Sequence, residues 1–244
     1  MGPRNPREIF PEIISDYKSV FGADLVSIIL YGSAAGKDYR PGRSDINFMI
    51  VLTGEGIERL DRAFDMVKRW RKRNVAIPLF LTEGYIKTSL DVFPVEYLSF
   101  KRNYVLIYGK DVLEGLTFDM ELVRLQCERE IKGKLLLLRQ AFLETSGRGK
   151  ALKELVANSI PALIAIFEAL LYIKGKEIPR ERREIVRSVA EAFGVERGVF
   201  ERLVEIEAEK VKLSDREIRE FFKGYLREMR RLSGLVDALG GGDE

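Results

Sequence analysis

Small and polar residues stand at the ends of two apolar segments, where they could bind a phosphate and a cation. Gly32 and Ser33 directly follow one apolar, β-branched run, and Asp45 and Asn47 flank the start of the next. Glycine lets backbone amides approach a bound group closely, and a serine hydroxyl can donate to a phosphate oxygen. On a strand, Asp45 and Asn47 share one face while Ile46 turns to the other. The pattern indicates a phosphate beside a hard cation held by oxygen ligands.

The loop between the two segments is cationic. It contains Lys37, Arg40 and Arg43, most of which we expect to be ordinary solvated charges. Lys37 and Arg43 join the Gly-Ser turn as candidate nucleotide-binding residues, because phosphate is anionic. A helix beginning near Ala34 would add its N-terminal amides and its dipole to this site.

The elements that must position these residues alternate between strands and helices in the first half of the chain. Apolar runs predict strands over residues 25–31, 46–52, 75–81, 94–100 and 105–108. Helical periodicity predicts helices over 6–21, 56–73 and 82–90, the last capped by Thr82. In the second helix, one apolar stripe is expected to face the core: Ile57, Leu60, Phe64, Val67 and Trp70.

Beyond Gly115 the sequence predicts helices only. They span residues 118–145, 151–174 with a bend at Pro161, a segment framed by Pro179 and Gly194, 196–210, and 215–239 behind a Ser214–Glu217 capping box. On the first of these, Arg124, Glu128 and their neighbours are expected to form solvated ion pairs. The expected class is α+β: residues 1–115 form a mixed sheet flanked by helices, and 116–244 form an all-α bundle.

Composition excludes several kinds of chemistry. The 244 residues contain no histidine, so imidazole bases, Ser-His-Asp triads and histidine metal sites are ruled out. One cysteine allows no internal disulfide, which favours a reducing, cytoplasmic setting. The net charge of +3 does not indicate nucleic-acid binding, and segment 160–173 is too short to span a membrane. The high charged fraction, 32%, is typical of thermophile proteins.

The chain resembles the nucleotidyltransferases of the DNA polymerase β superfamily. The resemblance rests on an apolar strand, Gly32-Ser33, a spacer of about ten residues, and Asp45-Ile46-Asn47 in the next strand, where the family has Asp-x-Asp. The helices that follow resemble the bundle of the minimal and antibiotic nucleotidyltransferases. The signature covers about a tenth of the chain, and the order of elements extends the likeness over roughly the first 110 residues.

The resemblance implies transfer of a nucleoside monophosphate from an NTP, most simply ATP, to a hydroxyl of a small molecule, protein or RNA. In the family, Mg²⁺ ions bridge three carboxylates and the triphosphate. Asp45 fits one of these positions, and Glu96 fits the third, which the family takes from a later strand; Asp91 is a weaker candidate. The resemblance leaves the acceptor open, and the helical part is a candidate homodimer surface.

Asn47 departs from the family pattern at the second metal-ligand position. An amide offers one neutral oxygen where a carboxylate offers two charged ones, so binding of a second metal should suffer most. The residue is a native degenerate ligand, a functional substitute, or a substitution introduced to trap a complex. Two hypotheses therefore stand: an Mg²⁺-dependent nucleotidyltransferase, or a degenerate nucleotidyltransferase domain that binds a nucleotide or a partner protein without turnover.

Overall fold

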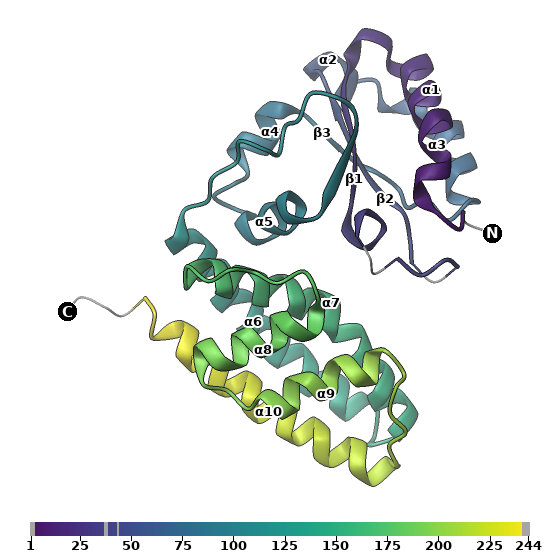
Figure 1. The fold of residues 1–244 in the computed structure, drawn as a ribbon. Helices are drawn as coiled ribbons and strands as arrows, with labels where there is room; N and C mark the ends of the chain where they lie inside the picture. Colours follow the sequence, from purple (N-terminus) through teal and green to yellow (C-terminus); the bar gives the residue numbers. More distant parts are fainter. Residues whose placement is uncertain (1–2, 37–38, 43, 241–244) are drawn as a thin grey trace. The chain divides into compact units, whose positions relative to one another are not determined.

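A computed structural model of the chain describes residues 3–36, 39–42 and 44–240. The chain divides into two compact units, Met1–Thr117 and Phe118–Glu244. The first contains a mixed β-sheet with helices, and in the described residues the second contains helices alone (Figure 1). The expected α+β class is confirmed.

The sheet of the first unit has four strands in the order β3-β2-β1-β4. Their bounds are Leu25–Tyr31 (β1), Asn47–Leu52 (β2), Leu79–Leu81 (β3) and Tyr104–Gly109 (β4). β1 is antiparallel to β2 and β4, whereas β3 runs parallel to β2. An isolated bridge between Ile46 and Val75 extends the parallel pair toward the start of β2. The sheet is therefore mixed, and its central strand β1 ends where β2 begins.

Helices α1 (Phe10–Phe21) and α3 (Phe64–Arg71) lie together on one side of the sheet, and α4 (Glu83–Thr88) and α5 (Pro94–Arg102) on the other (Figure 1). Alternate strand residues fill the core with the first pair, as period-two alternation requires. The fully buried members of this core include Ile28, Phe48, Ile50, Tyr17 and Trp70. Short helical turns complete the unit: η1 (Pro6–Ile9), η2 (Gly22–Asp24), η3 (Gly32–Ala35), α2 (Gly54–Ile57) and η4 (Leu60–Ala63).

The continuous helix expected over 56–73 is broken into α2, η4 and α3. The hydroxyl of Thr53 accepts from Gly56 N at 3.1 Å and donates to Asp24 Oδ1 at 2.6 Å, which fixes an early helix start. Arg59 then leaves helical geometry, with φ −118° and ψ 28°. The break shifts the helical phase, so the expected apolar stripe is wrong in part. Phe64 is 72% exposed, and its place in the core is taken by Met66.

The strand expected over 94–100 is instead the helix α5. Pro94 occupies the first turn, where its missing N–H costs nothing. Burial of Pro94, Val95, Tyr97 and Leu98 follows a helical period rather than alternation. The dense apolar content of this segment fits the period of a strand and the period of a helix alike. Pro94 was the signal that favoured the helix. Glu96 therefore projects from an exposed helix turn, not from a strand.

The second unit consists of five long helices in its described residues. They are α6 (Met120–Glu144), α7 (Gly149–Ile173), α8 (Arg182–Phe193), α9 (Arg197–Glu207) and α10 (Asp215–Asp237). The Ser214–Glu217 capping box forms as expected, and Gly194 ends α8 in the left-handed region. Pro179 precedes α8 by several residues and does not begin it.

Helix α7 is the central helix of this unit, since it packs against α6, α8, α9 and α10. By length and composition alone, all 25 residues of α7 form a helix that could cross a membrane, a longer segment than the sequence estimate of 160–173. Half of its most apolar window is buried inside the protein, with Leu152, Val156 and Phe167 fully enclosed. A core helix has the same composition, so this feature is weak evidence for a membrane segment.

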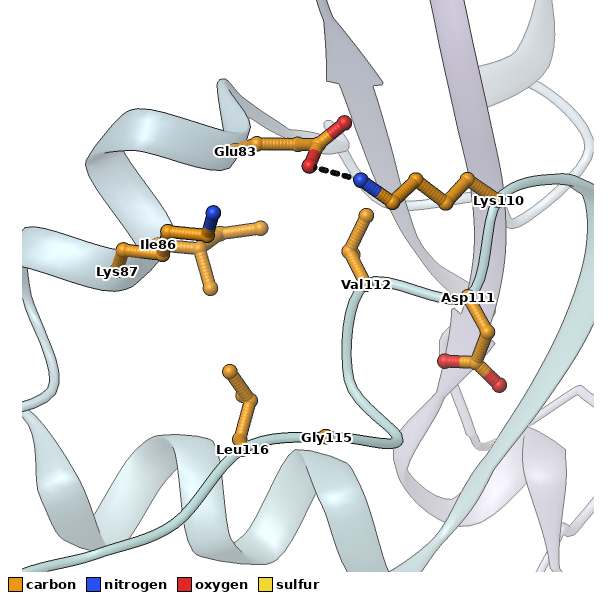
Figure 2. Close-up of a pocket in the computed structure, with 8 residues that line it drawn as sticks. All are labelled: Glu83, Ile86, Lys87, Lys110, Asp111, Val112, Gly115 and Leu116. Carbon is orange, nitrogen blue, oxygen red and sulfur yellow. Dashed lines mark hydrogen bonds and ion pairs between the residues drawn. The ribbon is translucent and has the colours of Figure 1, made fainter.

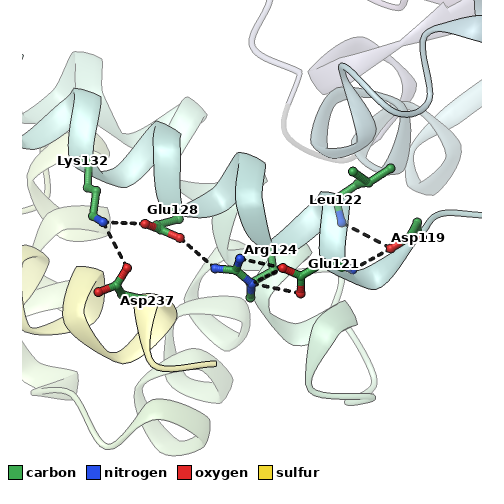
Figure 3. Close-up of polar contacts among 7 residues, drawn as sticks. All are labelled: Asp119, Glu121, Leu122, Arg124, Glu128, Lys132 and Asp237. Atoms are coloured by element: carbon green, nitrogen blue, oxygen red, sulfur yellow. Dashed lines mark hydrogen bonds and ion pairs between the residues drawn. The ribbon is translucent and has the colours of Figure 1, made fainter. Parts of the chain in front are cut away.

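A chain of ion pairs links the start of α6 to the end of α10 (Figure 3). Arg124 donates to Glu121 at 2.6 Å and to Glu128 at 2.7 Å. Lys132 contacts both Glu128 and Asp237. The expected pairing at i, i+4 is present, but Arg124 is only 8% exposed, so the expected solvated position is wrong. Its burial under the end of α10 makes the network a tertiary contact.

Candidate nucleotide site

The antiparallel pairing of β1 and β2 brings the Gly-Ser turn against the start of β2. Tyr31, the last residue of β1, is the register partner of Asn47, the first residue of β2. Gly32 follows with φ +74°, a conformation that favours glycine. A Cβ built on Gly32 would lie 3.6 Å from Asn47 Nδ2. The amide of Asn47 therefore lies directly beside the turn, half-buried, while Asp45 is exposed two residues earlier.

The turn itself is the four-residue 3-10 helix η3, and the helix expected from Ala34 does not form. Gly36 N donates to Ser33 O at 3.2 Å, which closes the turn, and Ala34 anchors it in the core. So short a turn adds no significant helix dipole. Any phosphate here would be held by single backbone amides and the half-buried Ser33 hydroxyl.

Asn103 braces the turn from the end of α5. Its Nδ2 donates to Gly32 O at 3.0 Å. A Cβ on Gly36 would lie 2.8 Å from the same nitrogen, so only glycine fits there without displacing Asn103. Asn103 was not predicted from the sequence, because nothing near it signals a contact with a turn so distant along the chain.

A second asparagine holds the strand segment that carries Asp45. Asn74 lies just beyond α3 with φ 65°, and its Nδ2 donates to Ser44 O at 2.9 Å. Ile46 N donates to Asn74 O at 3.1 Å. Both neighbours of Asp45 are therefore bonded to one residue at the end of α3. The sequence offered a signal that was missed, since asparagine is common in the left-handed position after a helix.

The cationic loop is only partly visible. Lys37 and Arg43 lie outside the described residues. Arg40 is exposed, and a turn joins it to Ser44: Ser44 N donates to Arg40 O at 2.8 Å, and Arg40 N donates to Ser44 Oγ at 3.1 Å. This turn leads the chain into Asp45, so the loop cations and the carboxylate belong to one continuous segment.

Glu96 reaches the vicinity of the turn only through its helix. It shares a face of α5 with Phe100, one helical turn later. The ring of Phe100 packs on that of Tyr31 at 4.7 Å between centroids. This contact places the face carrying Glu96 beside the end of β1. A metal-ligand role for Glu96 stays a prediction.

The side chains of the candidate site determine whether it can hold the Mg²⁺ that the resemblance implies. Among the described residues, no three histidine, cysteine or acidic side chains gather closely enough to hold a metal ion. Asp45, just before β2, and Asn47, its first residue, both have side-chain oxygens, the donor type that suits a hard cation. They do not suit two cations, which need several bridging carboxylates. Within the residues that the structure describes, the donors would suit one Mg²⁺ better than a two-metal centre.

Tyrosines around the site remain neutral. Burial raises the pKa of Tyr31 above its ordinary value. Burial also raises the pKa of Tyr104 to about 12, helped by the hydrogen bond that its hydroxyl donates to Asp111 at 2.7 Å. Neither phenol therefore serves as a general base near neutral pH.

A separate small hollow lies between α4 and the segment after β4 (Figure 2). Its floor is apolar, with Ile86 and Leu116, and an ion pair at 2.5 Å joins Lys110 to Glu83 at its rim. Its volume is about 210 Å³, less than the usual range for a ligand pocket. None of the candidate nucleotide-site residues lines it, so it is not part of that site.

Comparison with known proteins bears on the fold. No protein-family model matches the chain, and no curated protein matches it either. Among solved structures, it is similar to spectinomycin adenyltransferase AAD(9) from Enterococcus faecialis, solved with ATP and spectinomycin. The TM-score is 0.54 and the identity 16%, over 93% of this chain and 99% of that one. The chain therefore shares the fold of this adenyltransferase over nearly the full length of both.

Proposed function

We propose that the chain binds a nucleoside triphosphate, with ATP the first candidate, together with one Mg²⁺ at the meeting point of β1 and β2. Gly32 and Ser33 contact the phosphates, while Asp45 and Asn47 hold the cation. Glu96 is the candidate third ligand, and Lys37 and Arg43 are candidate phosphate contacts. The cation neutralises phosphate charge when bound. The associated activity is transfer of a nucleoside monophosphate to a hydroxyl.

One observation carries this proposal: the register pair Tyr31–Asn47 brings the start of β2 beside a glycine turn with positive φ, and Asp45 lies two residues before Asn47. Two neighbouring segments thereby offer phosphate donors and cation ligands within one small region. The shared fold supports the same reading, because the similar adenyltransferase was solved with ATP. Fold alone does not fix function, so the site residues must be tested directly.

A non-catalytic nucleotide-binding module is the second candidate, and Asn47 specifically favours it. Its amide is neutral, and the described residues provide no cluster of three acids. Bound nucleotide would then keep one cation and lack the charge needed to stabilise a leaving pyrophosphate. In this form the protein would bind nucleotide without turnover, and the helical unit would serve as its interaction surface.

Titration with a non-hydrolysable ATP analogue, with and without Mg²⁺, tests nucleotide binding. We expect binding by the unmodified chain to strengthen with Mg²⁺ and Asp45→Ala to lose that dependence. Asn47→Asp adds a carboxylate beside Gly32, so its Mg²⁺-dependent affinity should rise about tenfold, or about 1.4 kcal/mol. Asn158→Asp is the matched control, because it makes the same change on an exposed turn of α7.

The outcomes separate the two candidates. If neither the unmodified chain nor Asn47→Asp binds the analogue, the nucleotide proposal is wrong. Transfer of label from α-labelled ATP by the unmodified chain, with release of pyrophosphate, would rule out the non-catalytic module. Pyrophosphate release that appears only in Asn47→Asp would identify a degenerate catalytic site.

A further inference from the structure

Helix α3 and the two residues that follow it carry far more positive charge than the fold requires. Residues 68–73 read KRWRKR, five cations around one tryptophan. Cations in the last turn of a helix complement its dipole, and one or two suffice for that. Like charges at i, i+3 and i+4 repel one another and disfavour the helix. The surplus charge therefore needs an explanation outside the stability of α3.

The cations of α3 fall into two sets. Arg69 and Arg73 turn toward α1 and pair with Asp16 at 2.5 Å and Glu12 at 2.6 Å, while Trp70 Nε1 donates to Asp16 at 2.8 Å. These contacts fix the rotation of α3 about its axis. Lys68, Arg71 and Lys72 are exposed, and within the described part of the chain none of the three forms an ion pair.

An aromatic residue lies in line with the unpaired cations. Phe64 precedes Lys68 by four residues, so it shares the helix face of Lys68, Arg71 and Lys72. Its side chain is 72% exposed, although a phenylalanine ordinarily gains most by burial. We call Phe64, Lys68, Arg71 and Lys72 the basic strip. Its length is about 12 Å, roughly three to four nucleotides of a strand at about 3.4 Å each.

The basic strip ends next to the candidate nucleotide site. The chain leaves α3 through Asn74, whose side chain donates to Ser44 O and whose carbonyl accepts from Ile46 N. Asp45 lies between these two bonded residues. The carboxylates bordering the strip, Asp61 and Asp65, lie at its opposite end, beside Phe64. Positive charge therefore increases along the strip toward Asp45.

We propose that the basic strip binds single-stranded nucleic acid, with a base stacked on Phe64 and backbone phosphates on Lys68, Arg71 and Lys72. Stacking on an exposed ring combined with a row of cations is how proteins hold single strands without reading sequence. A bound strand would run along α3 toward Asp45, which lies just before the start of β2. This surface goes beyond the proposed function, which concerns a mononucleotide, and the low net charge of the whole chain conceals it.

Fluorescence anisotropy with an end-labelled 12-nucleotide oligo-U RNA tests the proposal over a range of salt concentrations. The triple variant Lys68→Gln, Arg71→Gln, Lys72→Gln should bind more weakly. The slope of log affinity against log salt should fall by about 2, since each phosphate contact on a single strand contributes about 0.7. Phe64→Ala should weaken binding at least about fivefold with an unchanged salt slope, because it removes stacking alone.

The matched control removes three positive charges elsewhere on the chain. Arg216, Arg227 and Arg230 are exposed on α10, and their triple glutamine variant should bind the RNA as the unmodified chain does. Equal weakening by both triple variants would overturn the proposal, because only total charge would then matter. The proposal would also be overturned if Phe64→Ala bound the RNA as tightly as the unmodified chain, or if the chain bound heparin but not RNA. Asp45→Ala should keep RNA binding, so loss of nucleotide binding leaves this test intact.

Discussion

Charged residues have different structural roles in the two units. In the helical unit, ion pairs share partners: Glu201 receives Arg187 at 2.5 Å and Arg197 at 3.0 Å, and Glu128 receives Arg124 and Lys132. In the sheet unit, the pairs on α3 join segments far apart in sequence, as in Arg69–Asp16 and Arg73–Glu12. The helical unit thus uses charge largely along and between neighbouring helices, whereas the sheet unit uses it to orient α3 against α1.

The difference shows where function is expected. Many charged residues of the helical unit form ion pairs that share a partner, although others, such as Arg216, Arg227 and Arg230 on α10, are exposed. In the sheet unit, the same sequence feature, a run of cations on α3, is divided between structure and an unpaired exposed face. Polar groups left without a structural task are available to a ligand, and in the sheet unit such groups lie on the exposed face of α3 and beside the ends of β1 and β2.

The comparison between the two units is tested most strongly by a substitution that leaves a cavity in the core of each. Phe48 and Phe167 are fully buried in the sheet unit and the helical unit respectively. Replacing either with alanine should cost its own unit about 3–5 kcal/mol, because a large cavity remains. Urea unfolding separates the two, since Trp70 is the single tryptophan and its fluorescence reports the sheet unit, while circular dichroism at 222 nm is dominated by helix.

Phe167→Ala should therefore shift the circular dichroism transition and leave the fluorescence transition in place. Phe48→Ala should instead shift the fluorescence transition more than the circular dichroism transition. Equal shifts of both signals by either variant would show that the two units unfold together. The contrast between the units would then be one of composition and not of independent stability.

Asp16→Ala tests the long-range use of charge in the sheet unit. It removes the acceptor of both Trp70 Nε1 and Arg69, and Asp16 is only 21% exposed. The loss should be about 2–3 kcal/mol, because a buried indole N–H is left unsatisfied. Glu12→Ala is the control: it breaks only the more exposed pair with Arg73 and should cost less than about 1 kcal/mol. Similar losses for both would show that the indole contact adds nothing.

Much of the fold followed from local patterns. The strands at 25–31 and 46–52 were predictable because both are short, apolar and β-branched, and the caps at Thr82 and Ser214 because a hydroxyl precedes each helix. The break at Arg59 was not, because it depends on the contact between Thr53 and Asp24. The strand prediction for segment 94–100 was wrong because its dense apolar content fits both the period of a strand and the period of a helix.

The candidate site divides in the same way. The apolar runs predicted that Asn47 starts a strand close to the Gly-Ser turn, whereas the shared face of Asp45 and Asn47 stays a prediction, because β2 begins only at Asn47. Asn103 could not be predicted, because it reaches Gly32 from 71 residues away. Phe64 was assigned to the core because a continuous helix was assumed, and the phase shift at the break exposed it.

Acid should weaken the helical unit through Glu128. Hydrogen bonds from Lys132 and then Arg124 lower the pKa of Glu128 from an ordinary 4.5 to about 2. The carboxylate therefore contributes stability that is fully present above about pH 4.5 and is lost as pH falls toward 2. We expect about 1–2 kcal/mol, allowing for solvent screening of a side chain that is 18% exposed. Urea unfolding followed by circular dichroism at pH 6, 4 and 2.5 measures it.

Glu128→Gln is the control for this pH effect. It cannot titrate, so its stability should vary less over the same interval than that of the unmodified chain. A parallel decline in both proteins would assign the acid sensitivity to other carboxylates. That outcome would mean that neutral hydrogen bonds from residue 128 stabilise the helical unit as well as its shared ion pairs do.

The smallest expected effect compares one helix cap from each unit. Ser214 Oγ accepts from Glu217 N at 3.3 Å within a reciprocal capping box, and Thr82 Oγ1 accepts from Tyr85 N at 3.0 Å with no reciprocal acid. Replacing either with alanine should cost about 1 kcal/mol. Ser214→Ala should cost the more, because it also removes the hydroxyl that contacts the Glu217 carboxylate at 2.7 Å. Urea midpoints from circular dichroism for Ser214→Ala and from tryptophan fluorescence for Thr82→Ala measure both. A larger loss for Thr82→Ala would mean that α4 depends on its cap more than the long, well-packed α10 does, and that local hydrogen bonds matter most where helices are short.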